Sequence, residues 1–235
     1  MSIHDSAALE PPGTIAVVGA GPLGIEAALY GRFLGYNVTI IESDSVGHSM
    51  KAISDQPIPM LPDRCLSPLA VSAINAQSPD GPPFVLPTTI GEWIENALIK
   101  LTETDLLRGR LRCPMRVTRI EHLAIEPDEE DDVSELDAIP PDFRLSSETG
   151  DNLDAEAVIL ATGLDAAIPC DFALPTPYLF RIGEAPASDP ERDFLLGLKQ
   201  IVEVYAQLAD RKSLDLYIRN PYPTALAEPA VDEEE

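Results

Sequence analysis

Three glycines at regular spacing follow a short apolar run near the start of the chain. Gly19, Gly21 and Gly24 have G-x-G-x-x-G spacing and come directly after residues 15–18, a run typical of a strand buried on both faces of a parallel sheet. In this motif the first glycine allows a tight turn, the second lets the backbone approach a pyrophosphate, and the third lets the next helix pack closely on the sheet. The pattern predicts a site for a dinucleotide.

The residues after the glycines extend this prediction. Pro22 suits the first turn of a helix, where a missing N–H costs nothing, and Leu23 follows it. The start of that helix directs free N–H groups and the positive end of its dipole at the phosphates. A second strand, residues 37–41, leads to Glu42, whose carboxylate can accept hydrogen bonds from a ribose 2′-hydroxyl. A carboxylate there disfavours a 2′-phosphate, so NADP is the least expected ligand.

Composition and charge exclude several classes of function. The 235 residues are 45% hydrophobic, which is enough for a sizeable core, and 40 acidic against 16 basic residues give a net charge of −24. This charge argues against binding to nucleic acid or to an anionic membrane surface. No apolar stretch is long enough to span a bilayer, and no secretory leader is recognisable. Three cysteines without a C-x-x-C pair suit a reducing cytosol, so we expect a cytoplasmic protein; no cluster predicts a metal site.

The chain divides into segments by composition. Residues 1–13 are predicted to be a flexible leader, residues 14–218 a single domain, and residues 219–235 an acidic disordered tail. Within the domain, residues 44–87 are rich in Pro, Ser and Asp and predict an irregular segment, while residues 126–141 are predicted to form an acidic loop.

Several further elements are expected inside the domain. A helix begins at Thr89, which has capping-box spacing to Glu92, and its apolar face places Trp93 in the core. A turn signal at residues 148–152 joins two strands in hairpin fashion, and a final helix begins near Ser188. After the helix that begins at Thr89, strands are expected at residues 116–120, 143–147, 157–161 and 178–182.

Two later motifs add to the glycine motif. Ala161-Thr162-Gly163 ends one apolar strand, and Gly183-Glu184 ends another just before a helix. In this order the motifs resemble those of the flavoprotein pyridine-nucleotide oxidoreductases, the superfamily of thioredoxin reductase and glutathione reductase, and also those of flavin-containing monooxygenases. The resemblance extends from residue 14 to residue 210. It implies an α/β fold: a Rossmann-like FAD/NAD(P)-binding domain with a central parallel sheet and a small antiparallel β-meander.

The resemblance also implies roles for individual residues. Residues 19–24, with Pro22 and Leu23 among them, would cradle the FAD pyrophosphate, and Glu42 would hold the adenosine ribose. The backbone of Val117 would pair with the adenine. Ala161, Thr162 and Gly163 would pass beside the middle of the cofactor. Glu184 follows Gly183 at the position where the family has an Asp that binds the ribityl chain.

The chain also departs from the family. Only residues 164–182 separate the second and third motifs, where two-nucleotide members have an entire NAD(P)H-binding domain, and no second glycine motif occurs. A C-terminal dimerisation domain is missing as well, so we expect the FAD-binding domain alone. Residues near a flavin ring would come from the irregular segment. His48 could transfer protons, Lys51 could stabilise negative charge on reduced flavin, and Cys65 could be a redox thiol. The alternative is that His48 and Lys51 are loop residues without a catalytic role and that Cys65 is a buried structural cysteine.

Three functions fit these observations. The first is an FAD-binding oxidoreductase of the reductase or monooxygenase type that lacks a separate NAD(P)H-binding domain and acts on a small-molecule substrate or a redox partner protein. The second is a non-enzymatic module that binds FAD or NAD and acts through a partner protein. The third is an enzyme that holds NAD instead of FAD at the glycine motif. The substrate, the electron donor and the oligomeric state do not follow from the sequence.

Overall fold

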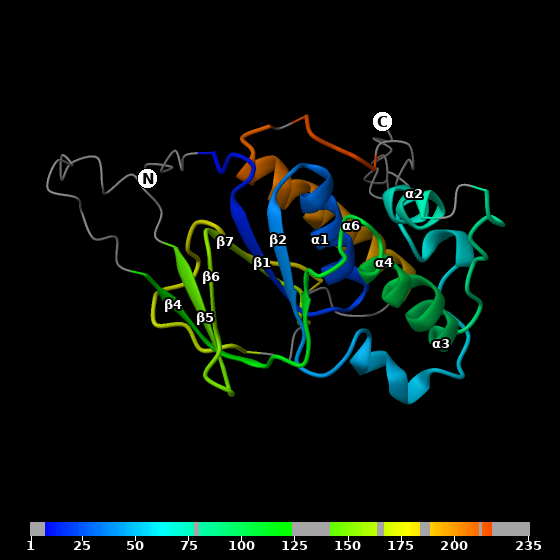
Figure 1. The fold of residues 1–235 in the computed structure, drawn as a ribbon, viewed down its shortest axis with the longest axis horizontal. Helices are drawn as coiled ribbons and strands as arrows, with labels where there is room; N and C mark the ends of the chain where they lie inside the picture. Colours follow the sequence, from blue (N-terminus) through cyan, green and yellow to red (C-terminus); the bar gives the residue numbers. More distant parts are fainter. Residues whose placement is uncertain are drawn as a thin grey trace, which may run out of the picture.

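A five-stranded parallel sheet forms the centre of the protein (Figure 1). The structure is a computed structural model that describes residues 8–77, 80–123, 142–163, 167–183, 189–211 and 213–217. Across the sheet the order is β3 (Leu111–Arg112), β2 (Asn37–Ile41), β1 (Thr14–Val18), β7 (Ala157–Leu160) and β8 (Leu179–Arg181). The side chains of β7 and of residues 15–18 in β1 are all buried, as the continuous apolar runs predicted.

A second, antiparallel sheet lies beside the first and confirms the predicted meander (Figure 1). It consists of β4 (Val117–His122), β5 (Phe143–Ser147) and β6 (Asn152–Ala155). The turn at residues 148–152 therefore joins β5 to β6, not to residues 157–161 as predicted. The prediction missed β6 because two of its four residues are Asn152 and Asp154, types that are depleted in strands.

Helices α1 (Pro22–Phe33) and α6 (Pro190–Leu208) lie together on the other side of the parallel sheet (Figure 1). Tyr30 and Tyr205 stack between them with ring centroids 5.1 Å apart, and the Tyr205 hydroxyl donates to Ala27 O at 2.8 Å. A β-carbon on Gly31 would overlap that hydroxyl. The first helical residue of α6 is Pro190, and Asp189, not the expected Ser188, is its capping residue.

The segment at residues 44–87 is more regular than predicted. It contains the 3-10 turns η1 (His48–Ile53) and η2 (Pro62–Arg64) and the nine-residue helix α2 (Pro68–Ala76). Ser67 caps α2 and Pro68 stands at its first position, which is a start signal that the sequence does carry. The prediction overlooked it because α2 is short.

The helix predicted at Thr89 forms with its capping box. It runs through α3 (Ile90–Trp93), a π-helical stretch η3 (Ile94–Ile99) and α4 (Lys100–Thr102). Trp93 is only 3% exposed and packs in the core, as predicted, and it also lines the cleft described below. This helix lies on the opposite side of the molecule from the antiparallel sheet (Figure 1).

The first described residues are tied to the domain, whereas the prediction treated residues 1–13 as a flexible leader. Leu9 N donates to Leu208 O at 2.8 Å, and the Tyr36 hydroxyl donates to Leu9 O at 2.8 Å. The domain extends at least to Tyr217, which is fully buried. The predicted acidic loop and tail lie outside the described residues. In the described part of the chain, no helix has the length and apolar character needed to cross a membrane.

Candidate functional site

One cleft of about 620 Å³ runs along the carboxyl ends of the parallel strands. Residues at the ends of β1, β2, β7 and β8 line it, together with the start of β4 on one side and with η1, α3 and α6 on the other. In parallel α/β sheets this edge is where ligands bind. A cavity of similar size, about 670 Å³, lies between residues 82–87 and α4, but none of the predicted site residues lines it.

The surroundings of the three glycines agree with the separate roles that their spacing predicts. Gly19 has φ +108°, and a β-carbon there would lie 2.6 Å from Ala161 O. A β-carbon on Gly24 would overlap the Gly19 carbonyl oxygen, so this glycine is required by close helix–strand packing. A β-carbon on Gly21 would meet nothing within 4 Å, and Gly21 lines the cleft. The chain thus keeps open space at the one glycine that is expected to face a pyrophosphate.

Helix α1 begins at this open space. Its N-terminal capping residue is Gly21, no side chain caps it, and its first turn holds no acidic residue. Pro22 and Leu23 both line the cleft, and a β-carbon on Gly183 would lie 2.8 Å from Leu23 Cδ1, so Leu23 also packs against the end of β8. An uncapped helix start of this kind suits an anion because its N–H groups and its dipole both face the ligand.

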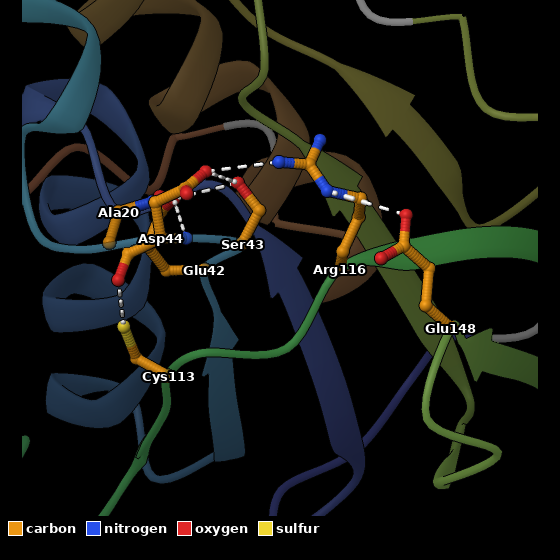
Figure 2. Close-up of polar contacts among 7 residues, drawn as sticks. All are labelled: Ala20, Glu42, Ser43, Asp44, Cys113, Arg116 and Glu148. Atoms are coloured by element: carbon orange, nitrogen blue, oxygen red, sulfur yellow. Dashed lines mark hydrogen bonds and ion pairs between the residues drawn. The ribbon is translucent and has the colours of Figure 1, made fainter.

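Glu42 lies in the same cleft and is only 9% exposed (Figure 2). Its Oε2 accepts a hydrogen bond from Ala20 N at 2.8 Å, and its Oε1 accepts from Asp44 N at 3.0 Å and from Ser43 Oγ at 3.1 Å. A carboxylate oxygen can accept two hydrogen bonds, so Oε2 keeps one acceptor site for a ligand hydroxyl. The geometry fits the predicted contact to a ribose, although the carboxylate is more deeply buried than a strand end near solvent would suggest.

The far side of the cleft is apolar. Its side chains include Met50, Ile90, Trp93 and Phe194, and the rings of Trp93 and Phe194 meet edge to face with centroids 6.0 Å apart. Among the described residues, neither Trp93 Nε1 nor Asp193 Oδ2 has a hydrogen-bond partner, although both atoms are buried. This region suits a flat ring system, and the sequence did not point to it because its members come from three separate segments.

A second helix, α6, also begins at the cleft, but its N-terminus differs from that of α1. The Asp189 carboxylate accepts hydrogen bonds from Glu191 N at 3.2 Å and Arg192 N at 3.3 Å. Glu191 and Asp193 add two more acidic residues in the first turn, and Asp193 lines the cleft. The start of α6 is therefore already satisfied by the chain's own carboxylates.

Most of the predicted cofactor residues are brought together in the cleft. Besides the glycines and Glu42, it is lined by Pro22, Leu23, Val117, Ala161, Thr162, Gly163 and Gly183, with Gly24 packed directly behind. Gly183 N donates to Gln200 Oε1 at 2.8 Å. Glu184, the predicted ribityl contact, lies outside the described residues.

The three catalytic candidates are not brought together. His48 is exposed and lines the cleft, whereas Lys51 and Cys65 are not among the described residues that line it. Lys51 Nζ donates instead to Ser45 Oγ at 2.8 Å. Cys65 is fully buried, and this burial raises the pKa of its thiol to about 12, which opposes formation of the reactive thiolate. The structure thus supports the interpretation of Cys65 as a core residue.

Two cleft residues beside Glu42 and Val117 were missed. Ser43 follows Glu42, and Arg116 precedes Val117; both line the cleft. Arg116 is the only Lys or Arg among the described residues that do so. Their positions next to two predicted contacts are a signal that sequence reasoning can use. The described residues hold no group of His, Cys, Asp and Glu side chains suited to a metal ion.

Comparison with known proteins gives distant structural likenesses. No protein-family model matches the chain, and no curated protein matches it in sequence. The structure of OTEMO in complex with FAD and NADP is 18% identical, with a TM-score of 0.45, over 67% of this chain and 27% of that one. The bacillithiol disulfide reductase Bdr (YpdA) of Staphylococcus aureus is 16% identical, with a TM-score of 0.42, over 64% of this chain and 42% of that one.

The atypical thioredoxin reductase TRi of Desulfovibrio vulgaris Hildenborough is a further likeness. It is 22% identical, with a TM-score of 0.38, over 66% of this chain and 37% of that one. This chain therefore spans less than half the length of each of these proteins. Likenesses this distant do not say what the chain binds, so the case for a ligand rests on the geometry of the cleft.

Proposed function

We propose that the chain binds FAD in the cleft and is the FAD-binding part of an oxidoreductase of the reductase or monooxygenase type. The observation that carries this proposal is the continuity of the cleft. It places open space at Gly21, an uncapped helix start, a carboxylate with a remaining acceptor site at Glu42 and an apolar region around Trp93 in one cavity.

The parts of the cleft match the parts of FAD in chemistry and in order. The space at Gly21 and the start of α1 would hold the pyrophosphate, and Glu42 would accept from the adenosine ribose. The apolar side chains around Trp93 and Phe194 would enclose the isoalloxazine ring. Bound flavin would supply the redox chemistry, while the chain supplies binding, orientation and local charge.

The apolar region favours FAD over NAD. In both dinucleotides a pyrophosphate joins the adenosine half to a second ring, but the isoalloxazine is a large tricyclic system and nicotinamide a single small ring. Met50, Met60, Ile90, Trp93 and Phe194 offer a wide apolar surface, which matches the larger ring. NAD remains the alternative ligand that a binding measurement must include.

The absorbance spectrum of the purified full chain tests the proposal. We expect a yellow protein, or a colourless apoprotein that takes up one equivalent of FAD without a covalent bond. Titration with NAD under the same conditions is the matched control and should show weaker binding. A correctly folded protein that takes up no added FAD contradicts the proposal.

A second function is favoured by the scatter of the catalytic candidates. Cys65 is buried, and Lys51 is directed to Ser45, so neither meets His48 in the cleft. This arrangement suits a non-enzymatic module that binds FAD or NAD and acts through a partner protein. A protein that binds FAD tightly, yet whose flavin is reduced by dithionite and by no physiological donor, whether small molecule or protein, would favour this second function over the first.

A further inference from the structure

An ionic cluster lies next to Glu42, and one of its members, Arg116, lines the cleft (Figure 2). Arg116 Nη2 lies 3.1 Å from Asp44 Oδ2, and Arg116 Nε lies 3.5 Å from Glu148 Oε1. Ser43 Oγ lies 2.8 Å from Asp44 Oδ2 and 3.1 Å from Glu42 Oε1. A continuous set of polar contacts therefore leads from the carboxylate proposed to hold the ribose to the guanidinium of Arg116.

The backbone holds Arg116 in this place. Met115 N donates to Glu42 O at 2.7 Å, and Glu42 N donates to Arg112 O at 3.0 Å, so the chain before Arg116 runs beside the end of β2. Glu148 N donates to Arg116 O at 3.2 Å, which links Arg116 to the turn between β5 and β6. Hydrogen bonds at Met115 N and at Arg116 O therefore hold the backbone of Arg116 beside Glu42, and neither of them involves the Arg116 side chain.

The charges of the cluster decide what kind of group it can meet. The carboxylates of Asp44 and Glu148 pair with one guanidinium, and the Glu42 carboxylate lies one contact further away, beyond Ser43, so the cluster has no net positive charge to offer a phosphate. A flat, neutral base meets no such repulsion. Asp44 and Glu148 approach Nη2 and Nε, whose N–H groups lie in the plane of the guanidinium, so these contacts do not occupy the faces with which a guanidinium stacks on an aromatic ring.

We propose that Arg116 is a specificity-determining residue that stacks on the adenine of the bound dinucleotide, with Asp44 and Glu148 as positioning residues that hold the guanidinium in place. The inference rests on the proposed FAD site, because the base attached to a ribose held by Glu42 must lie next to Arg116. The side chains of Arg116, Asp44 and Glu148 are 52%, 40% and 61% exposed, so solvent screens their ion pairs and a ligand in the cleft that Arg116 lines can reach the guanidinium.

Binding of FAD and FMN to flavin-free full-length protein tests this proposal. FMN lacks the adenosine half, so it reports the rest of the site. We expect Arg116→Ala to weaken FAD binding by about tenfold, the effect of losing one base-stacking contact, and to leave FMN binding within about twofold of wild type. Arg116→Lys keeps the charge but loses the planar group, and it should also weaken FAD binding by at least about threefold.

Arg119→Ala is the matched control. Arg119 lies in β4, three positions after Arg116, is similarly exposed at 54% and pairs with Glu121 at 2.9 Å, but it does not line the cleft, so its loss should leave both affinities unchanged. The proposal is overturned if Arg116→Ala binds FAD as wild type does, if FMN loses as much affinity as FAD, or if Arg116→Lys binds FAD with wild-type affinity. Failure of the wild-type protein to bind FAD would instead reject the proposed function itself.

Discussion

Two helices begin at the same cleft, and their N-termini are built in opposite ways. Helix α1 starts at Gly21 without a side-chain cap and without an acidic residue in its first turn. Helix α6 starts at Asp189, which caps it, and continues with Glu191 and Asp193. The first start is open to an anionic ligand, whereas the second is already neutralised by carboxylates of the chain.

This difference assigns the two ends of the cleft to different tasks. In the proposed site, the end at Gly21, with Glu42 beside it, would receive a charged pyrophosphate and a ribose. The end at Trp93 and Phe194 is apolar, and the nearby acidic start of α6 opposes further negative charge there. Binding and reactivity should therefore respond to different mutations, and the following predictions separate the two ends.

The largest expected effect concerns the rate at which NADH or NADPH reduces FAD bound in the cleft. Only residues 164–182 separate the Ala161-Thr162-Gly163 motif, which follows β7, from Gly183. This interval is too short for a nicotinamide-binding domain. Alignment of two bound reactants is worth roughly 7–11 kcal/mol of barrier, and we expect direct reduction of bound FAD by NADH or NADPH to be slow. Anaerobic stopped-flow bleaching measures it, with dithionite as the control reductant. Fast, saturable bleaching by either nucleotide would show that the cleft itself positions a nicotinamide.

Substitutions at two neighbouring glycines give the next largest effects. One should reduce stability, and the other should abolish FAD binding. Gly24→Val forces a side chain into the Gly19 carbonyl, so we expect a loss of stability of about 3 kcal/mol or more. Gly21→Val enters open space, so the fold should persist while FAD binding is abolished. Thermal unfolding and flavin titration of both variants give the comparison. Wild-type FAD affinity in the Gly21 variant would place the pyrophosphate elsewhere.

The face of α1 that is turned away from the cleft carries a pH-dependent contact. Glu26 is fully buried and accepts from Ser67 N at 2.8 Å and Ser67 Oγ at 2.6 Å; burial raises its pKa from 4.5 to about 7. Because the folded-state pKa is the higher one, this group stabilises the fold fully below about pH 4.5, and the contribution is lost as pH rises through about 7.

We therefore expect Glu26→Gln to flatten the dependence of stability on pH. The difference in unfolding free energy between wild type and variant should change by about 3 kcal/mol between pH 4 and pH 8, at about 1.4 kcal/mol per unit of pKa shift. Urea unfolding at both pH values measures it, and FAD affinity should stay unchanged. Equal pH profiles for the two proteins would mean that Glu26 is ionised in the folded state.

Glu42→Ala should weaken FAD binding by about 1.5–3 kcal/mol, the range for a hydrogen bond to a charged group. It should also lower stability, because Ala20 N and Asp44 N lose their acceptor. Calorimetric titration with FAD measures the first effect, and thermal unfolding without ligand measures the second. Unchanged affinity would show that the carboxylate has only a structural role.

The smallest effect is expected at the other helix start. Asp189→Ala removes the cap of α6 and should cost about 1 kcal/mol of stability. FAD affinity should change little, since the pyrophosphate is assigned to α1. A gain in FAD affinity well beyond error would instead show that the open start of α6 can also serve an anion, which would break the contrast between the two helices.

Local rules of chain geometry determined much of this protein from its sequence. The apolar run before Gly19, the positive φ at Gly19, the tight packing at Gly24 and the strand that ends at Glu42 all follow from turn chemistry and strand periodicity. The capping box at Thr89 was likewise predictable, because it needs only two side chains three residues apart. The parallel sheet and the glycine end of the cleft could therefore be predicted.

Short elements escaped the same rules because they have too little periodicity. The two-residue strand β3 is recognisable only by its pairing with β2, and β6 only by its pairing with β5. Helix α2 carries a cap at Ser67 but is only nine residues long. In each case contacts between distant segments decide the structure, and local preference is too weak to reveal them.

The rest of the site exists only in three dimensions. Met50, Trp93 and Phe194 belong to three separate segments, and nothing in their spacing predicts that they enclose one apolar region. Arg116 and Asp44 are 72 positions apart, and backbone hydrogen bonds between β2 and the chain before β4 bring them together. The sequence alone could determine the nucleotide end, because one continuous segment builds it. Only tertiary packing could decide the apolar end and the Arg116 cluster, because each is made of side chains that meet across the fold.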